Sequence, residues 1–103
     1  MKKKKSGNIS FKSSREVGKF LGLSDIEINL ILQKKALIRK LNNKRLELGL
    51  SQVELAHMVG TKQPAIARME SGLVSEVSMD FLLKIAMALD ISVTIKPTTK
   101  IAA

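Results

Sequence analysis

The sequence predicts an all-α protein that has an N-terminal helical extension and one short C-terminal β-strand. Three observations lead to this prediction. Apolar residues through much of 13–90 recur at spacings of three, four and seven residues, as they do on one face of a helix. Residues that cap helix N-termini precede these stretches, and glycines follow most of them. One stretch, 91–96, instead alternates apolar and polar residues as a strand does.

The first residues are expected to form a flexible arm. Residues 1–12 are basic and polar and offer little apolar surface to offset the entropy lost on ordering. The spacing Ser13-x-x-Glu16 is that of a capping box and predicts a short helix that ends near Gly22. We therefore assign residues 13–34 to a helical extension that also includes the start of the next helix.

A longer helix follows. Ser24-x-x-Glu27 is a second capping box, and no Gly or Pro interrupts the chain from there to Leu48, after which Gly49 ends the run. The apolar positions keep helical spacing throughout. The sequence predicts one long helix here, or two with a bend near Lys34–Lys35.

Two short helices are predicted next, joined by a turn that is centred on one glycine. The capping box Ser51-x-x-Glu54 begins a helix that Gly60 ends. Thr61 is expected to cap the following helix, whose first turn holds Gln63–Pro64, since proline in a first turn removes no helical hydrogen bond. The segment Glu70–Gly72 ends that helix.

The predicted C-terminal elements are a helix from Ser78 to about Leu89 and the strand 91–96. A single strand cannot satisfy its own backbone, so it must pair with another chain's strand or lie against a helix. The simplest partner is its own copy across a two-fold axis, and the alternative is a frayed extended tail. The expected dimerisation residues are Ile91, Val93 and Ile95, with 97–103 as a tail.

Length and charge limit the kinds of partner that the protein is expected to bind. The chain of 103 residues has room for one small domain and carries a net charge of +9. That charge lies in residues 1–50, because residues 51–103 hold equal numbers of basic and acidic side chains. The asymmetry favours an anionic partner: nucleic acid, anionic lipid or an acidic protein surface. A lysine-rich arm that only aids solubility is the alternative.

Other features of the composition exclude function classes. The chain has no cysteine, hence no disulfide or thiolate metal site, and this favours a reducing, cytoplasmic location. Its one histidine, His57, has no evident catalytic partner, so we expect neither an enzyme nor a cofactor or metal. No stretch is long and apolar enough to span a membrane. The polar Ser6–Asn8 after the lysines argues against a signal peptide.

Residues 52–71 have the pattern of a helix-turn-helix unit, two short helices joined by a glycine-centred turn. Ala56 must be small because the second helix crosses over it. Gly60 supplies the positive φ that so short a turn requires. Four apolar side chains close the angle between the helices, and they are Leu55, Val59, Ile66 and Met69.

With these motifs the sequence resembles helix-turn-helix domains of the Cro and phage-repressor type, also known as the XRE family. The resemblance covers residues 35–90 and rests on Leu48–Ala56, Gly60–Ile66 and Arg68–Gly72. It implies a five-helix, lambda-repressor-like domain whose helix from Gln63 enters the DNA major groove. The base-reading or base-adjacent positions that it implies are Lys62, Gln63, Ala67 and Arg68. The phosphate-contacting positions that it implies are Gln52 and Thr61.

The chemistry of these residues fits the implied roles. A glutamine amide matches the edge of adenine, and the arginine fork matches that of guanine. Pro64 stands where some family members have a polar base-contacting residue, so specificity would rest on fewer side chains. The plainer alternative is that Gln63 and Arg68 are ordinary polar residues of a solvated helix. The resemblance also implies a structural ion pair between Arg45 and Glu70.

The C-terminal segment Phe81–Ile95 is similar to antitoxins of the HipB and HigA kinds, in which the last helix leads into a strand that pairs across the dimer axis. The stretch from Phe11 to Glu27 also looks like small antitoxin-type regulators encoded beside a RelE- or HigB-like toxin. The resemblance therefore adds a toxin protein to the candidate partners.

Two functions follow as predictions. The first is a homodimeric, sequence-specific repressor that binds double-stranded DNA at an inverted repeat, represses its own gene and associates with the nucleoid. In it, Lys2, Lys3, Lys4 and Lys5 of the arm would contact phosphates. The second is an antitoxin that neutralises a HigB/RelE-like or HipA-like toxin through residues 1–34 and also represses its own operon.

Overall fold

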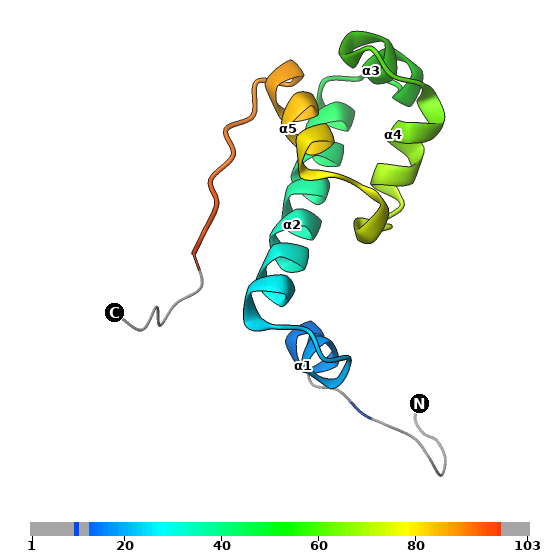
Figure 1. Cartoon of the computed structure of the whole chain (residues 1–103). Coiled ribbons are helices and arrows are strands. Elements are labelled where there is room, and N and C mark those ends of the chain that lie inside the picture. Colours follow the sequence, from blue (N-terminus) through cyan, green and yellow to red (C-terminus); the bar gives the residue numbers. More distant parts are fainter. Residues whose placement is uncertain (1–9, 11–12, 98–103) are drawn as a thin grey trace.

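The computed structural model describes residue 10 and residues 13–97 (Figure 1). Within these residues the chain forms five α-helices, one 3-10 turn (η1) and no strand. Their bounds are α1 Ser14–Phe20, α2 Asp25–Glu47, α3 Gln52–Val59, α4 Gln63–Glu70, η1 Val74–Glu76 and α5 Met79–Ala88. The long helix α2 is continuous, which decides between the two alternatives left by the sequence. The all-helical prediction is confirmed.

The serine caps that the sequence predicts are present. Ser24 and Ser51 each accept a hydrogen bond from the backbone N–H three residues on, and the glutamate there accepts one from the serine N–H. Ser78 caps α5 in the same way, without a returning bond from a side chain. These bonds satisfy N–H groups that a helix N-terminus otherwise leaves unpaired, which explains why α2, α3 and α5 begin where they do.

The prediction that Thr61 caps α4 is wrong. The N-cap is Lys62, whose side chain makes no capping hydrogen bond. Thr61 instead belongs to the preceding turn, because its N–H donates to the carbonyl of Ala56 at 2.9 Å. Gly60, at φ 75°, makes that return of the chain possible.

The core lies between the C-terminal half of α2 and the three helices that gather beside it (Figure 1). It contains fully buried side chains from α2, α3, α4 and α5, among them Leu41, Leu55, Ile66, Met69, Leu82 and Ile85. The N-terminal half of α2 extends beyond this core and carries α1. The expected boundary between residues 34 and 35 therefore falls inside one unbroken helix.

α1 packs on α2 through a glycine. Gly18 is buried, and a Cβ atom placed on it would lie 2.6 Å from Cγ1 of Ile28, which is itself 2% exposed. Only a glycine allows the two helices to approach this closely.

Replacing Gly18 with alanine is expected to loosen α1. The same change inside a helix ordinarily stabilises by about 0.5–1 kcal/mol, so a destabilisation would be diagnostic of the close approach. Hydrogen exchange of the α1 amides measures it, and the same change should cost less in an Ile28→Ala background, where the side chain that it would meet is absent. Slower exchange in Gly18→Ala than in the parent would contradict the packing.

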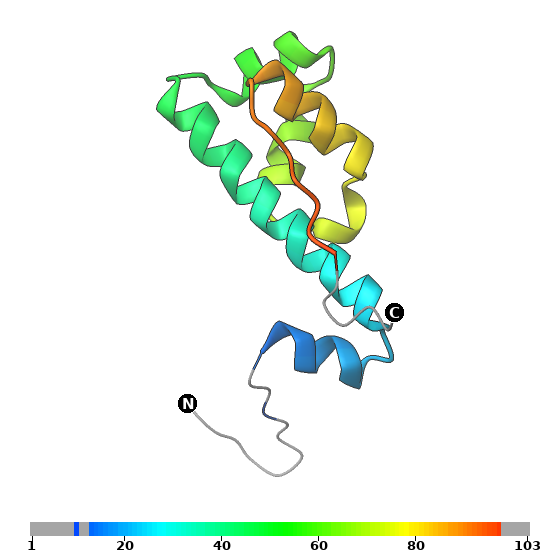
Figure 2. The same cartoon turned by 90° about the vertical axis from the view of Figure 1, so that its left-hand side faces the viewer.

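The predicted strand 91–96 is not a strand in the structure. Residues 91–97 are extended and run back along α2 (Figure 2). Ile91 and Val93 pack against the core, whereas Ile95 is 67% exposed. A ladder needs backbone groups on the neighbouring element, but those of a helix are already bonded within it. The alternation of apolar residues indicated an extended chain correctly and could not supply the second strand.

Candidate nucleic-acid interface

The unit formed by α3, its turn and α4 has the packing that its sequence requires. Ala56 is 3% exposed at the crossing of the two helices, and Leu55, Ile66 and Met69 are fully buried. Val59 is half-buried against the same core. The N-terminal end of α4 remains at the surface, and these buried contacts hold the helix against α3.

An ion pair joins α2 to the end of α4. The Arg45 guanidinium donates from Nε to Oε2 of Glu70 at 2.6 Å and from Nη2 to Oε1 at 2.9 Å. A third donor, Nη1, bonds the Leu50 carbonyl at 2.6 Å. The two side chains are only 10% and 8% exposed. The structure thus brings Arg45 and Glu70 together in a bidentate, largely buried pair.

Two glutamines continue this network toward the surface. Gln52 donates from Nε2 to Oε1 of Glu70 at 2.9 Å, and Gln63 donates from Nε2 to Oε1 of Gln52 at 2.7 Å. The family resemblance implied a phosphate contact for Gln52 and a base contact for Gln63, and the sequence gave no sign that the two would bond each other. The reason is that they lie on different helices, whose approach no local pattern records.

The network leaves part of the Gln63 amide unused. One N–H of Gln63 is bonded to Gln52, while its Oε1 and second N–H have no hydrogen bond in the described part of the chain. An amide with one free acceptor and one free donor is what recognition of adenine requires. The buried carboxylate of Glu70 therefore orients, through Gln52, an amide that still has hydrogen-bonding capacity.

The other predicted contact residues of the helix-turn-helix unit lie just before α4 or on it. Lys62 and Arg68 are exposed, and Thr61 and Ala67 are half-buried. Arg68 Nε lies 3.8 Å from Oε1 of Glu76, and both side chains are more than half exposed. This weak pair leaves the Arg68 fork accessible. Lys2, Lys3, Lys4 and Lys5 lie outside the described residues.

No group of three or more His, Cys, Asp and Glu side chains in the described chain could hold a metal ion. None of the described helices combines the length and apolar character needed to cross a membrane.

Comparison with known proteins identifies the family of this chain. A family model described as helix-turn-helix matches residues 41–96, which is more than half of the chain. The chain belongs to the helix-turn-helix family. The match includes α3 and α4 together with Arg45 and Glu70, so the ion pair and both glutamines lie inside the family's domain.

A curated relative agrees with this assignment. An uncharacterized HTH-type transcriptional regulator of Haemophilus influenzae is 40% identical over 62 residues, which make up 60% of this chain and 62% of the relative. The chain thus spans about three fifths of the length of that helix-turn-helix protein. No solved structure matches the chain significantly.

Proposed function

We propose that the protein is a sequence-specific DNA-binding repressor that acts as a homodimer on an inverted repeat and regulates its own gene. The observation that mainly supports the proposal is the amide of Gln63 at the start of α4, which is held through Gln52 by a buried ion pair and keeps one donor and one acceptor without a hydrogen bond in the described residues. Pre-orientation of a reading side chain reduces the entropy lost on binding. Membership in the helix-turn-helix family and the name of the relative point in the same direction.

In this proposal α4 enters the major groove and each residue has a separate role. Gln63 and Arg68 read base edges, with Lys62 and Ala67 beside them. Gln52 and Thr61, together with the lysines of residues 2–5, contact phosphates and so set affinity and salt dependence. The Gln52–Gln63 bond means that both glutamines reach DNA as one unit.

The homodimer is supported by the backbone of the segment 91–97. In the described chain no hydrogen bond is recorded for the N–H and C=O groups of residues 92–95. Unpaired groups on an extended segment are a template for a second strand. Pairing of two copies would place two α4 helices on one DNA face, with half-sites about one helical turn, or a multiple of it, apart.

Fluorescence anisotropy tests the proposal, with DNA from upstream of the protein's own gene against a scrambled duplex at two salt concentrations. Specific recognition predicts binding at least about a hundredfold tighter to the upstream DNA. Equal and salt-sensitive binding to both duplexes would contradict it.

Two variants separate base reading from phosphate binding. Arg68→Ala is expected to cost about 1–3 kcal/mol on the operator and to relax preference at one base position. Replacing Lys2, Lys3, Lys4 and Lys5 with alanine is expected to weaken operator and scrambled DNA alike and to flatten the salt dependence. If Arg68→Ala lost equal affinity for both duplexes, its base-reading role would be wrong.

A second candidate function, an antitoxin that also represses its operon, is favoured by the surface at the α1–α2 end. Leu21, Ile26 and Leu30 are 67%, 71% and 48% exposed there, outside the core of the DNA-binding unit. Exposed apolar residues gathered at one end are typical of a protein-binding surface. The test is co-purification with the product of an adjacent toxin-like gene. Ile26→Asp should abolish this binding and leave operator affinity unchanged.

A further inference from the structure

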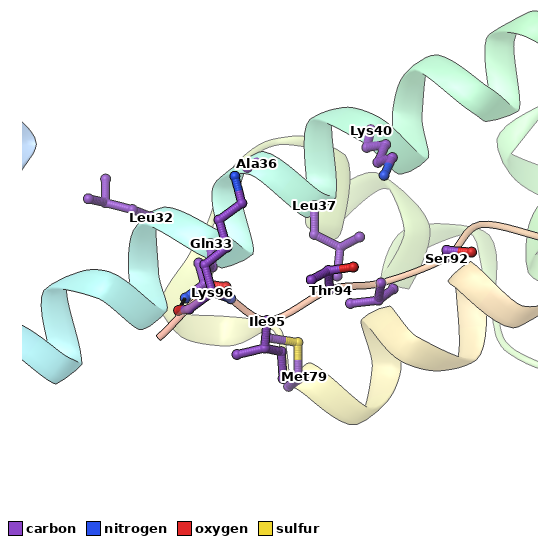
Figure 3. Close-up of a pocket in the computed structure, with 11 residues that line it drawn as sticks. Leu32, Gln33, Ala36, Leu37, Lys40, Met79, Ser92, Thr94, Ile95 and Lys96 are labelled. Atoms are coloured by element: carbon purple, nitrogen blue, oxygen red, sulfur yellow. Dashed lines mark hydrogen bonds between the residues drawn. The ribbon is translucent and has the colours of Figure 1, made fainter. Parts of the chain in front are cut away.

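One contact ties together parts of the chain that are more than sixty residues apart. The Gln33 side chain on α2 donates from Nε2 to the Lys96 carbonyl at 2.7 Å and accepts the Lys96 N–H on Oε1 at 2.8 Å. Asn29, one turn earlier, donates from Nδ2 to the same carbonyl at 3.3 Å. Figure 3 shows Gln33 beside the backbone of Lys96. We refer to these three hydrogen bonds as the amide latch.

The amide latch reproduces half of a strand pairing. A side-chain amide carries the same donor and acceptor as a peptide group, so Gln33 bonds both backbone groups of Lys96 as a residue on a neighbouring strand would. It does this without using the backbone of α2, which is already bonded within the helix. The amide latch thus provides hydrogen-bond partners for both backbone groups of Lys96, near the end of the segment 91–97 and on the side that faces α2.

Side-chain packing fixes the start of the segment, where Ile91 and Val93 contact the core, but it does not fix the end. A groove of about 390 Å³ remains between the segment and α2, lined by Leu32, Gln33, Ala36, Leu37, Lys40 and Met79 together with residues 92–96. Ile95 contributes little burial, since it is 67% exposed. Where packing is this loose, a shift along the helix would cost little unless specific hydrogen bonds opposed it.

The direction of the Lys96 groups determines which edge is open. In an extended chain, the N–H and C=O groups of alternate residues point to the same side. Because those of Lys96 face α2, those of Ile95 and Val93 face away from it. The open edge is therefore on the outer side of the segment.

We infer that Gln33, assisted by Asn29, is a positioning residue that sets the register of the segment 91–97 and presents its outer edge to the same segment of a second copy. The inference rests on the homodimer proposed above. It adds that the N-terminal half of α2, which lies outside the DNA-binding unit, controls the geometry of the dimer.

The experiment uses the full chain and two readouts. Exchange of the Lys96 amide, followed by NMR, reports the amide latch, because this N–H faces α2. Exchange of the Ile95 amide against protein concentration, together with sedimentation equilibrium, reports the dimer. The variants are Gln33→Met, which keeps length but removes both hydrogen-bonding groups, and Gln33→Glu, which can accept from Lys96 N–H but cannot donate to its carbonyl. Asn43→Met, at an exposed position of the same helix, is the control.

Gln33→Met is expected to speed Lys96 exchange and to weaken the dimer by about tenfold each, while Asn43→Met changes neither. Gln33→Glu should weaken the dimer at least as much. Unchanged Lys96 exchange in Gln33→Met would overturn the amide latch itself. Faster Lys96 exchange with an unchanged dimer would overturn its role in positioning. A parent protein that is monomeric, with Ile95 unprotected at every concentration, would overturn the proposed homodimer instead, and Lys96 exchange would still show whether the amide latch forms.

Discussion

Replacing Glu70 with alanine is expected to destabilise the folded protein by about 3–5 kcal/mol, because it leaves the Arg45 charge buried without its partner. Arg45 is 10% exposed on its side chain and bonds Glu70 through two nitrogens. Loss of one partner of a buried pair costs far more than the pair contributes in net terms. Urea denaturation followed by circular dichroism, at one fixed protein concentration, measures the change.

The control for this prediction is a surface ion pair on α2, the helix that carries Arg45. Lys44 and Glu47 lie 3.8 Å apart with Glu47 71% exposed, so Glu47→Ala should change stability by less than about 0.5 kcal/mol. Equal effects of Glu70→Ala and Glu47→Ala would show that burial of the Arg45–Glu70 pair has no energetic consequence. Conversely, replacing both partners by apolar residues of similar size should restore much of the lost stability.

The same change should also affect DNA binding. Gln52 loses the carboxylate to which it donates, and Gln63 loses the fixed orientation that Gln52 provides. At a temperature where Glu70→Ala remains folded, we expect weaker discrimination between operator and scrambled DNA, with little change in the salt dependence.

Proline at position 95 is expected to weaken the dimer by roughly 30-fold or more and to remove most operator binding with it. The change removes the outward N–H of residue 95 in each copy, so one carbonyl in each partner loses its hydrogen bond. Each of these two lost hydrogen bonds is expected to cost about 1–3 kcal/mol of dimer stability. Ile95 is 67% exposed, so the loss of its side chain removes little packing. Sedimentation equilibrium and anisotropy on the inverted repeat measure the two effects.

Thr94→Pro is the matched control. Thr94 is exposed as well, but in an extended chain its N–H points to the same side as that of Lys96, toward α2, and it makes no hydrogen bond within the described residues. It should therefore leave the dimer nearly intact, because proline tolerates extended backbone. If the two proline variants weakened the dimer equally, pairing through the outer edge would be wrong.

The helices could be predicted because their signals are local. Serines three residues before a glutamate begin α2 and α3, and glycines in the left-handed region follow both. Asp90 does the same after α5, at φ 58°, without the glycine that makes such a position easy to find. The sequence rules failed at Thr61, because the turn that ends α3 extends to this residue and α4 begins one residue later, with Lys62 as its N-cap.

The fold class, the helix-turn-helix unit and the residues on its exposed helix were determined by the sequence itself, since capping, helical periodicity and a left-handed glycine depend on neighbours a few residues away. Only the tertiary structure decided what those residues touch. Gln63 meets Gln52, and Gln33 meets Lys96, across separations of 11 and 63 residues. Such contacts depend on how whole helices pack, and a polar side chain carries no local mark of the distant group that it will bond. For that reason the extended conformation of residues 91–97 could be anticipated from the sequence, while the amide latch that holds their end could not.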